Sequence, residues 1–264
     1  MIAFFRDKRV SFIILLMIFG YGALFADSLT VIGRLSLPFC TNVFVRGSIC
    51  YATDAYGLEA IDVSNPSNPV LIGRCPLPDT GEAVVVVDSI GYVSDGDSGL
   101  AVVKLIPPES LRLLSRWRDY EGHAYEAAVN RDTVFLAYGF STEGRFPPYR
   151  GGLMMIDVRD PRMPTFLRFF AEAYSDTLPP YQFRYVIYSS VGIGNGGCYV
   201  AASVLYGDYI GSISFGSIDT VQYGTSGQLA YDRYSPLTHR KMALKYPYAY
   251  ITYPRWNPRN FSAL

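Results

Sequence analysis

Short runs of alternating hydrophobic and polar residues follow one another along most of the chain. The first group of runs covers residues 43–45, 49–53, 58–63 and 70–74, with Gly, Asp, Asn and Pro between them. A period of two residues, broken by turn residues, predicts antiparallel strands joined by tight turns. Because no stretch after residue 26 has the period of a helix, the pattern predicts an all-β fold.

The group of four strands is repeated. Ile-Asp-Val-Ser-Asn-Pro-Ser-Asn-Pro at residues 61–69 recurs as Ile-Asp-Val-Arg-Asp-Pro-Arg-Met-Pro at residues 156–164, and residues 50–58 match residues 91–100. Further groups start near Val84, Ala127, Tyr185 and Lys241. Repeated four-stranded antiparallel sheets of roughly 40 residues are typical of the blades of a β-propeller.

These residues resemble the LVIVD-repeat family. Its units read approximately as Tyr-x-Tyr-Val-Ala-Asp, Gly-Leu, Ile-Asp-Val-Ser-Asn-Pro and a closing Pro-Val-x-x-Gly strand, which residues 43–75 match almost throughout. The match is partial at residues 84–105 and 127–168 and weak at 184–264. The resemblance implies an exported or surface β-propeller, and it implies no catalytic residues.

The two ends of the chain bear on the number of blades. Residues 29–38 match residues 69–78, the fourth strand of the first group, whereas residues 242–245, 248–253 and 261–264 resemble a first, a second and part of a third strand. Pairing of the two ends would complete a ring of five blades and cover the sheet edges. The alternative is that the sequence is a fragment of a larger propeller.

The N-terminal residues 1–26 have the features of a secretory signal peptide. Arg6, Lys8 and Arg9 precede an apolar run over residues 10–25, and the small residue Ala26 suits cleavage. We therefore expect residues 27–264 to form the propeller domain and the protein to be secreted, periplasmic or at the cell surface. An uncleaved membrane anchor is the alternative, because the apolar run is only slightly short of a span.

Charge and cysteine content narrow the choice of partners. The chain has 23 Lys and Arg against 23 Asp and Glu, and this balance argues against nucleic acid, whose binding depends on a basic surface. Cys40, Cys50, Cys75 and Cys198 could pair in three ways in an oxidising compartment, or could be buried free thiols. No Cys-x-x-Cys is present to suggest zinc.

Long connecting segments gather at one end of the predicted blades. In a four-stranded antiparallel sheet, the turn after the second strand and the link to the next sheet lie at the same end. The segments 140–151, 172–183, 206–209, 231–240 and 254–260 all fall there, which favours this loop-rich face as the binding face. The candidate ligand-binding residues are the aromatic, Arg and His side chains Trp117, His123, Arg145, Tyr149, Arg150, Tyr181, Tyr206 and Trp256.

Motifs for catalysis or cofactor binding are weak. His123 lies near Asp119, Glu121 and Glu126, but a solvated loop histidine explains it as well as a metal or proton-transfer site does. Residues 95–99 lack the ligand spacing of an EF-hand and read as a hairpin turn. Residues 192–197 match Gly-x-Gly-x-x-Gly, yet a strand follows where a dinucleotide site needs a helix. We expect no cofactor and no metal.

The function that these observations favour is an exported, non-enzymatic binding or scaffolding propeller that engages a protein or a glycan through its loop-rich face. One alternative is a polysaccharide-acting propeller enzyme, a lyase or hydrolase, which would need two carboxyl groups across a cleft. The carboxyl candidates are Asp119, Glu121, Glu126, Glu143 and Asp176. Another alternative is one module of a larger cell-surface protein.

Overall fold

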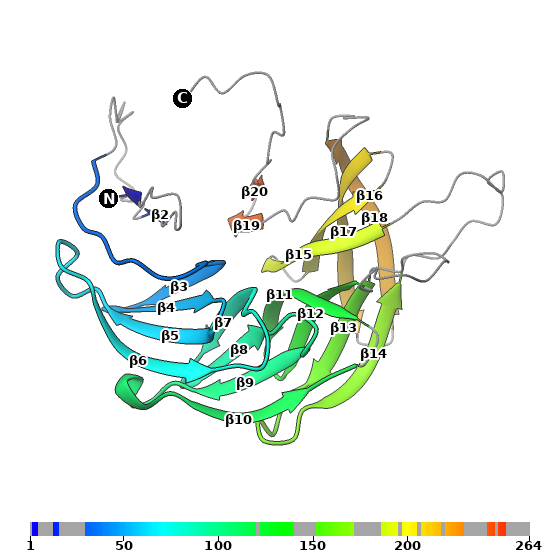
Figure 1. Cartoon of the computed structure of the whole chain (residues 1–264). Coiled ribbons are helices and arrows are strands. Elements are labelled where there is room, and N and C mark those ends of the chain that lie inside the picture. Colours follow the sequence, from blue (N-terminus) through cyan, green and yellow to red (C-terminus); the bar gives the residue numbers. More distant parts are fainter. Residues whose placement is uncertain are drawn as a thin grey trace, which may run out of the picture. The chain divides into compact units, whose positions relative to one another are not determined.

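The computed structural model shows two compact units, residues 1–116 and 117–264 (Figure 1). The structure describes residues 2–4, 13–15, 30–119, 122–139, 152–171, 186–194, 197–204, 207–217, 220–229, 242–245 and 248–251. Strands β1 (Ile2–Phe4) and β2 (Ile13–Leu15) form a small antiparallel pair at the N-terminus.

The first unit contains two sheets of four antiparallel strands. One sheet has the strand order β3 (Asn42–Arg46), β4 (Ile49–Asp54), β5 (Gly57–Asp62), β6 (Val70–Pro76). The other consists of β7 (Ala83–Val87), β8 (Ile90–Ser94), β9 (Leu100–Lys104) and β10 (Arg112–Trp117), with the short 3-10 helix η1 (Pro108–Ser110) before β10. Both sheets follow the chain order, as the hydrophobic pattern predicted.

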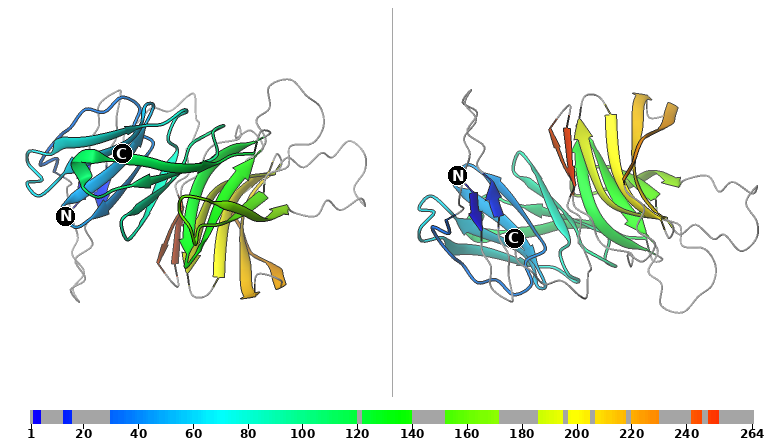
Figure 2. Two further views of the ribbon diagram at one scale, coloured as in Figure 1. Left: turned by 90° about the horizontal axis from the view of Figure 1, so that it is seen from below. Right: turned by 90° about the horizontal axis from the view of Figure 1, so that it is seen from above.

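The second unit repeats the arrangement. One sheet has the strand order β11 (His123–Asn130), β12 (Thr133–Gly139), β13 (Gly152–Asp157), β14 (Thr165–Ala171). The other has the order β15 (Val186–Gly194), β16 (Gly197–Val204), β17 (Gly207–Ser217), β18 (Thr220–Leu229). Strands β19 (Met242–Lys245) and β20 (Tyr248–Ile251) form an antiparallel pair. Two further views show the strands lying side by side within each sheet (Figure 2). The predicted all-β fold of four-stranded antiparallel blades is confirmed.

The repeated Asp-Pro and Asn-Pro motif has a clear structural purpose. Asp62 Oδ1 accepts the backbone N–H of Ser64 at 2.8 Å, and Asn65 Oδ1 accepts that of Ser67 at 3.1 Å. In the other copy, Asp157 and Asp160 accept the N–H groups two residues ahead in the same way. Side chains that bond to the backbone two residues on are typical of Asx turns. The motif therefore closes the turn between the third and fourth strands.

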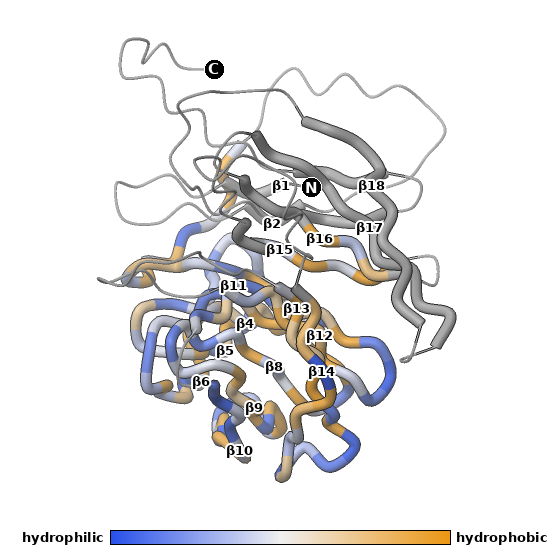
Figure 3. Tube along the Cα trace, turned by 90° about the vertical axis from the view of Figure 1, so that its right-hand side faces the viewer, coloured by the Kyte–Doolittle hydropathy of each residue, from blue (hydrophilic) through white to orange (hydrophobic). Residues whose placement is uncertain are grey.

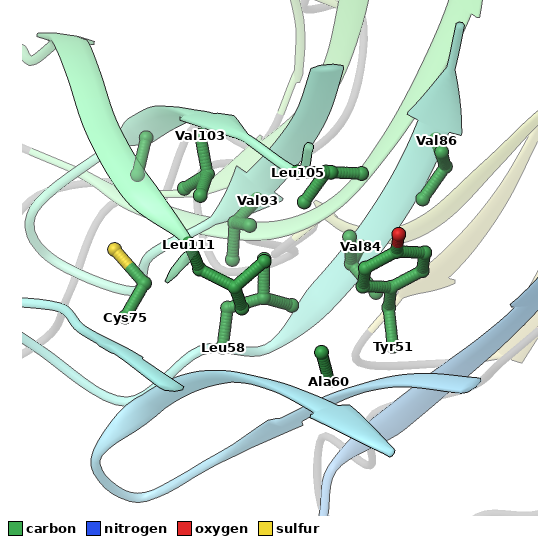
Figure 4. Close-up of a cluster of buried hydrophobic side chains, with 11 residues drawn as sticks. Tyr51, Leu58, Ala60, Cys75, Val84, Val86, Val93, Val103, Leu105 and Leu111 are labelled. Carbon is green, nitrogen blue, oxygen red and sulfur yellow. The ribbon is translucent and has the colours of Figure 1, made fainter. Parts of the chain in front are cut away.

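The core of the first unit lies between its two sheets (Figure 4). Apolar side chains of β4, β5 and β6, such as Tyr51 and Leu58, pack against Val84, Val93 and Leu105 of the second sheet. Leu58 and Val93 have no exposed surface. Full burial of a Leu or Val side chain stabilises the fold by roughly 1.5–3 kcal/mol, so the sheet faces provide most of the stability.

The second unit has an equivalent core between its two complete sheets. Met155 of β13 and Phe135 of β12 pack with Val191 of β15 and with Cys198 and Val200 of β16. Strands β12 and β13 are largely hydrophobic, whereas the connecting turns are hydrophilic (Figure 3). In each unit, therefore, neighbouring sheets pack face to face.

The N-terminal segment 30–38 differs from its prediction as a fourth strand, because these residues form no strand. No described strand lies beside the segment to give it a hydrogen-bond ladder. Its side chains Ile32, Leu35 and Leu37 nevertheless pack on the face of the first sheet that carries Cys50 and Ile61. The five-bladed closed ring and the larger-propeller alternative both stay predictions.

The position of this segment follows the repeat even so. A Cβ atom at Gly33 would overlap the carbonyl oxygen of Pro66, and a Cβ atom at Gly73 would overlap the carbonyl oxygen of Pro108. Pro66 and Pro108 lie in equivalent turns, before the fourth strands of the first and second sheets. Residues 30–38 thus lie on the first sheet as β6 lies on the second.

All four cysteines are free thiols, so of the two alternatives the structure shows unpaired cysteines. Cys50, Cys75 and Cys198 are buried, and Cys40 is half-buried. Burial raises the pKa of Cys40 and of Cys50 to about 12. Because the thiolate is the reactive form, these thiols are poor nucleophiles in the folded protein.

Helices of the kind that cross a bilayer were sought in the described segments, and none is long and apolar enough. The signal peptide, the domain bounds 27–264 and the destination of the protein stay predictions.

The close approach at Gly73 gives a testable prediction. Gly73→Ala places a methyl group on the carbonyl of Pro108, so the backbone must shift, and we expect the free energy of unfolding to fall by about 1–3 kcal/mol. Urea denaturation measures the change. Lys104→Ala, at an exposed strand position, is the control and should stay within about 0.5 kcal/mol of the parent protein. Equal stability of the two variants would contradict the close approach.

Candidate functional site

The turns after the second strands and the links between sheets meet at one end of the blades. Thr41 N donates to Thr53 O at 3.0 Å, and Glu82 N donates to Ser94 O at 2.7 Å, so in each sheet of the first unit the incoming link is bonded to the end of the second strand. Gly81 N also donates to the carbonyl of Asp54. We call this end of the first unit, residues 38–41, 54–57, 77–82 and 95–99, the link face.

A side chain at one repeat position secures a turn or a link in each of the first three sheets. The position is occupied by Asp54, Asp95 and Tyr138 in the first three sheets. Asp54 Oδ1 accepts the N–H groups of Tyr56 and Gly57 at 2.8 and 3.1 Å and so closes its own turn. In the second unit, the Tyr138 hydroxyl donates to the carbonyl of Asp119 at 3.0 Å. Asp54 and Tyr138 therefore each make hydrogen bonds that hold the local structure.

Asp95 is the most perturbed of these groups. Its Oδ1 accepts the N–H of Asp79 at 3.3 Å, whereas its Oδ2 is fully buried without a hydrogen-bond partner among the described residues. Burial is the main cause that raises the pKa of Asp95 to about 7; the charge of Asp79 adds to it, and the Asp79 N–H and Arg116 oppose it. Near neutral pH this carboxyl therefore holds its proton for part of the time.

Two buried carboxyl groups, those of Asp54 and Glu59, lie in the first sheet. Glu59 is fully buried, and its Oε1 accepts hydrogen bonds from Arg74 at 2.8 Å from Nε and 2.6 Å from Nη2. Burial and then the charge of the neighbouring Asp54 raise the pKa of Glu59, while Arg74 lowers it. Glu59 Oε2 and Asp54 Oδ2 have no donor among the described groups.

Two exposed aromatic side chains stand out on the link face. Phe39 is 76% exposed and Tyr56 is 58% exposed. Phe39 has a backbone φ of 55°, in the left-handed region that bulky residues rarely adopt. Tyr56 is held by its carbonyl, which accepts Leu77 N–H at 3.1 Å, and by the Asp54 turn.

The second sheet has aspartates at the matching positions. Asp79 follows Pro78 as Phe39 follows Pro38, and Asp97 lies in the turn that matches the one with Tyr56. There, Asp79 Oδ2 accepts Asp97 N–H at 2.7 Å and closes the link on the turn. The repeat therefore does not require aromatic residues at these two positions.

Of the residues predicted for ligand binding, the structure describes two side chains. Trp117 is half-buried and stacks on Phe166 with ring centroids 6.3 Å apart and 17° between planes. His123 begins β11 and lies against Tyr125, with ring centroids 4.6 Å apart. The other six lie outside the described residues: Arg145, Tyr149, Arg150, Tyr181, Tyr206 and Trp256. The segment 206–209 was a wrong prediction of a long loop, since β17 begins at Gly207.

Of the carboxyl groups predicted for a polysaccharide-acting enzyme, the structure describes those of Asp119 and Glu126. Glu126 lies in strand β11 rather than in a loop and accepts a hydrogen bond from Ser190 Oγ. The backbone carbonyl of Asp119 accepts from Tyr138, and Glu121, Glu143 and Asp176 lie outside the described residues. Within the described part of the chain, no group of three or more His, Cys, Asp or Glu side chains could hold a metal ion.

The two glycine motifs have the local structure that was predicted. Residues 95–99 form a hairpin turn in which Asp95 N donates to Gly99 O at 2.8 Å, and Gly96 and Gly99 have positive φ. The glycine motif at 192–197 lies where β15 and β16 pair as a hairpin, with Gly194 opposite Gly197. Strands on both sides leave no helix N-terminus for a dinucleotide phosphate.

Comparison with known proteins agrees with the fold. The described sheets are blades of a β-propeller, and the LVIVD repeat matches residues 40–76, which span β3 to β6. The chain therefore carries an LVIVD repeat over residues 40–76, within a β-propeller fold. A search of curated proteins gave no match.

Several solved structures are similar at low sequence identity. They include the periplasmic gluconolactonase PpgL of Pseudomonas aeruginosa (8% identity, TM-score 0.46, 76% of this chain and 75% of that chain). The computationally designed Ika4 protein is also similar (13%, 0.43, 74% and 94%), as is the β-propeller domain of Cps50 (Swd1) from Myceliophteria thermophila (10%, 0.38, 74% and 76%). At such identities, their activities and partners say nothing about this chain.

The buried carboxyl of Asp95 gives a pH-dependent prediction. Because its pKa is about 7 in the fold against roughly 3.9 in an unfolded chain, its contribution to stability is full below about pH 4 and is lost as the pH rises through 7. Asp95→Asn keeps an oxygen for Asp79 N–H and removes the titration. We expect the variant to gain stability over the parent protein between pH 4 and 7, by up to about 1.4 kcal/mol per pH unit.

Urea denaturation at several pH values measures this difference. Asp97→Asn changes an exposed carboxylate in the same turn and is the matched control. A stability difference between Asp95→Asn and the parent protein that does not vary with pH would contradict the assignment.

Proposed function

We propose that this protein is an exported, non-enzymatic binding propeller whose link face holds a protein partner. The observation that carries the proposal is the pair of exposed aromatic side chains, Phe39 and Tyr56, at positions where the neighbouring blade has Asp79, which closes its turn, and Asp97. Exposing these rings is unfavourable in water, and the backbone of Phe39 is strained as well. The fold alone does not require either cost.

A rigid frame supports both rings. The link before β3 is bonded to the end of β4 through Thr41 and Thr53, whose hydroxyl oxygens are 2.9 Å apart. The Thr41 hydroxyl also donates to the carbonyl of Gly81, in the next link. Aromatic side chains on a pre-ordered frame lose little entropy on binding, and they are frequent among the residues that dominate interface affinity.

The predicted loop residues extend this proposal. The sequence pattern predicts that Arg145, Tyr149, Arg150, Tyr181, Tyr206 and Trp256 belong to segments at this end of their blades, and aromatic residues with Arg are the usual anchors of protein interfaces. A glycan is the second candidate ligand, because sugar rings also stack on exposed aromatic side chains.

The variant Phe39→Asp with Tyr56→Asp tests the proposal by installing the residues of the second blade. Partners are captured from an extract of the source organism, identified by cross-linking from residue 56, purified, and titrated by calorimetry. We expect the double variant to bind its partner at least tenfold more weakly, because hot-spot residues contribute about 2 kcal/mol or more. Its thermal midpoint should not fall, since Asp tolerates positive φ better than Phe.

Val45→Ser with Val87→Ser removes two exposed apolar side chains near the other end of the same sheets and should leave affinity within about twofold. Equal binding by the aspartate variant and the parent protein would reject the link face. A rise in the thermal midpoint with an oligosaccharide, lost in the aspartate variant, would keep the face and replace the protein partner by a glycan.

A further inference from the structure

We propose that the turn between β13 and β14, with the start of β14, is a second interaction surface, which binds an acidic polypeptide segment carrying an apolar side chain. We call it the Met163 surface, and it consists of Trp117, Arg162, Met163, Phe166, Leu167 and Arg168. It lies in the second unit and is separate from the link face, so the two proposals stand or fall independently.

The two copies of the repeat motif give an internal comparison. Asp62 and Asn65 close the turn of the first sheet, and Asp157 and Asp160 close the turn of the third, each through the N–H two residues ahead. Asn68 N donates to Asn65 O at 3.0 Å, and Met163 N donates to Asp160 O, also at 3.0 Å. The fourth strand then begins with the same register shift in both sheets. The backbone frame is therefore the same.

The side chains on this frame are different. Residues 64–73 contain no charged residue, whereas the equivalent residues 159–168 contain three arginines and one aspartate. The exchanged pairs are Ser67 and Arg162, Asn68 and Met163, Leu71 and Phe166, and Gly73 and Arg168. Because the first copy forms the turn with Ser and Asn, the fold does not explain Arg and Met in the other copy.

The exposed side chains on this surface are those typical of interfaces. Met163 is 69% exposed and Phe166 is 52% exposed. Phe166 is held by stacking on Trp117, with ring centroids 6.3 Å apart, and the guanidinium of Arg168 lies 5.7 Å from the ring centroid of Phe170. Met, aromatic residues and Arg are the types enriched at protein interfaces.

The charges select the sign of the partner. Arg159 is engaged by Asp157, through Nε at 2.8 Å, and Asp160 accepts the backbone N–H of Arg162. Arg162 directly precedes Met163 and Arg168 follows Phe166 along the chain, and both arginine side chains are exposed. An apolar centre flanked by guanidinium groups is complementary to an apolar side chain flanked by carboxylates. A polypeptide supplies both features on one segment.

The variant Arg162→Ser with Met163→Asn tests this surface, because it installs the residues of the first copy in a turn known to accept them. The probe is a fluorescent peptide, Gly-Glu-Glu-Phe-Glu-Glu-Gly, titrated into the full chain and followed by anisotropy. We expect the parent protein to bind it, the variant to bind at least tenfold more weakly, and affinity to fall with added salt. The reciprocal variant Ser67→Arg with Asn68→Met keeps the Met163 surface and should bind no more weakly than the parent.

Three results would overturn the proposal. They are equal affinity of the parent protein and Arg162→Ser/Met163→Asn, equal affinity for a peptide with Lys in place of Glu, and no binding of the acidic peptide at all. Phosphatidylserine vesicles and a single-stranded oligonucleotide are the remaining arms. Tighter binding of either one than of the peptide, lost in the variant, would replace the acidic polypeptide by a membrane or by nucleic acid. Unchanged circular dichroism excludes misfolding of the variant.

Discussion

Face-to-face packing of neighbouring sheets is the constraint on which this structure depends. A sheet of four short strands has two apolar faces and can satisfy neither by itself. In the first unit, Leu58 of one sheet and Val93 of the next belong to the same apolar cluster, and both are completely buried. With every cysteine unpaired, this packing is noncovalent throughout. Each sheet therefore needs an adjacent apolar surface, and residues 30–38 provide one for the outer face of the first sheet.

Because the faces of the sheets are packed, the sequence can differ between repeats mainly at the ends of the strands. Turns between third and fourth strands repeat the same Asx geometry at Asp62 and Asp157, and the position of Asp54 is used each time to secure a turn or a link. Against this shared background, departures between copies are informative. Phe39, Tyr56 and Met163 are exposed where an equivalent position in another copy is polar. Both proposed surfaces rest on such departures.

Much of the fold could be predicted from the sequence, because the period of two and the Pro-containing turns report backbone geometry directly. The strands at 43–45, 49–53, 58–63 and 70–74 agree with β3 to β6 within two residues at each end. The segment 30–38 was predicted as a strand because its side chains fit that role, but a strand also needs a hydrogen-bonding neighbour, which sequence similarity does not supply. The burial of Glu59 also depends on residues that are distant in the sequence, so a local pattern does not predict it.

The candidate site was harder to predict. Phe39 and Tyr56 lie in short turns, which carry no sequence signal of a binding site. The one sequence feature that distinguishes them is the presence of Asp79 and Asp97 at the matching positions of the next blade. Long aromatic loops drew the prediction instead, and of those residues Trp117 turned out to stack on Phe166. Exposure of a ring depends on the path of the neighbouring link, which a single turn sequence does not specify.

The glycine contacts at Gly33 and Gly73 have a consequence for how such a chain could grow. Gly73 joins the fourth strand of the first sheet to the proline turn of the second sheet, and Gly33 joins the segment 30–38 to the proline turn of the first sheet, so each contact links one repeat to the next. A gene duplication that copies one period of roughly 40 residues preserves this contact wherever the copy begins, because every junction it creates brings together the same two partners. Lengthening the array therefore requires no new interface to evolve.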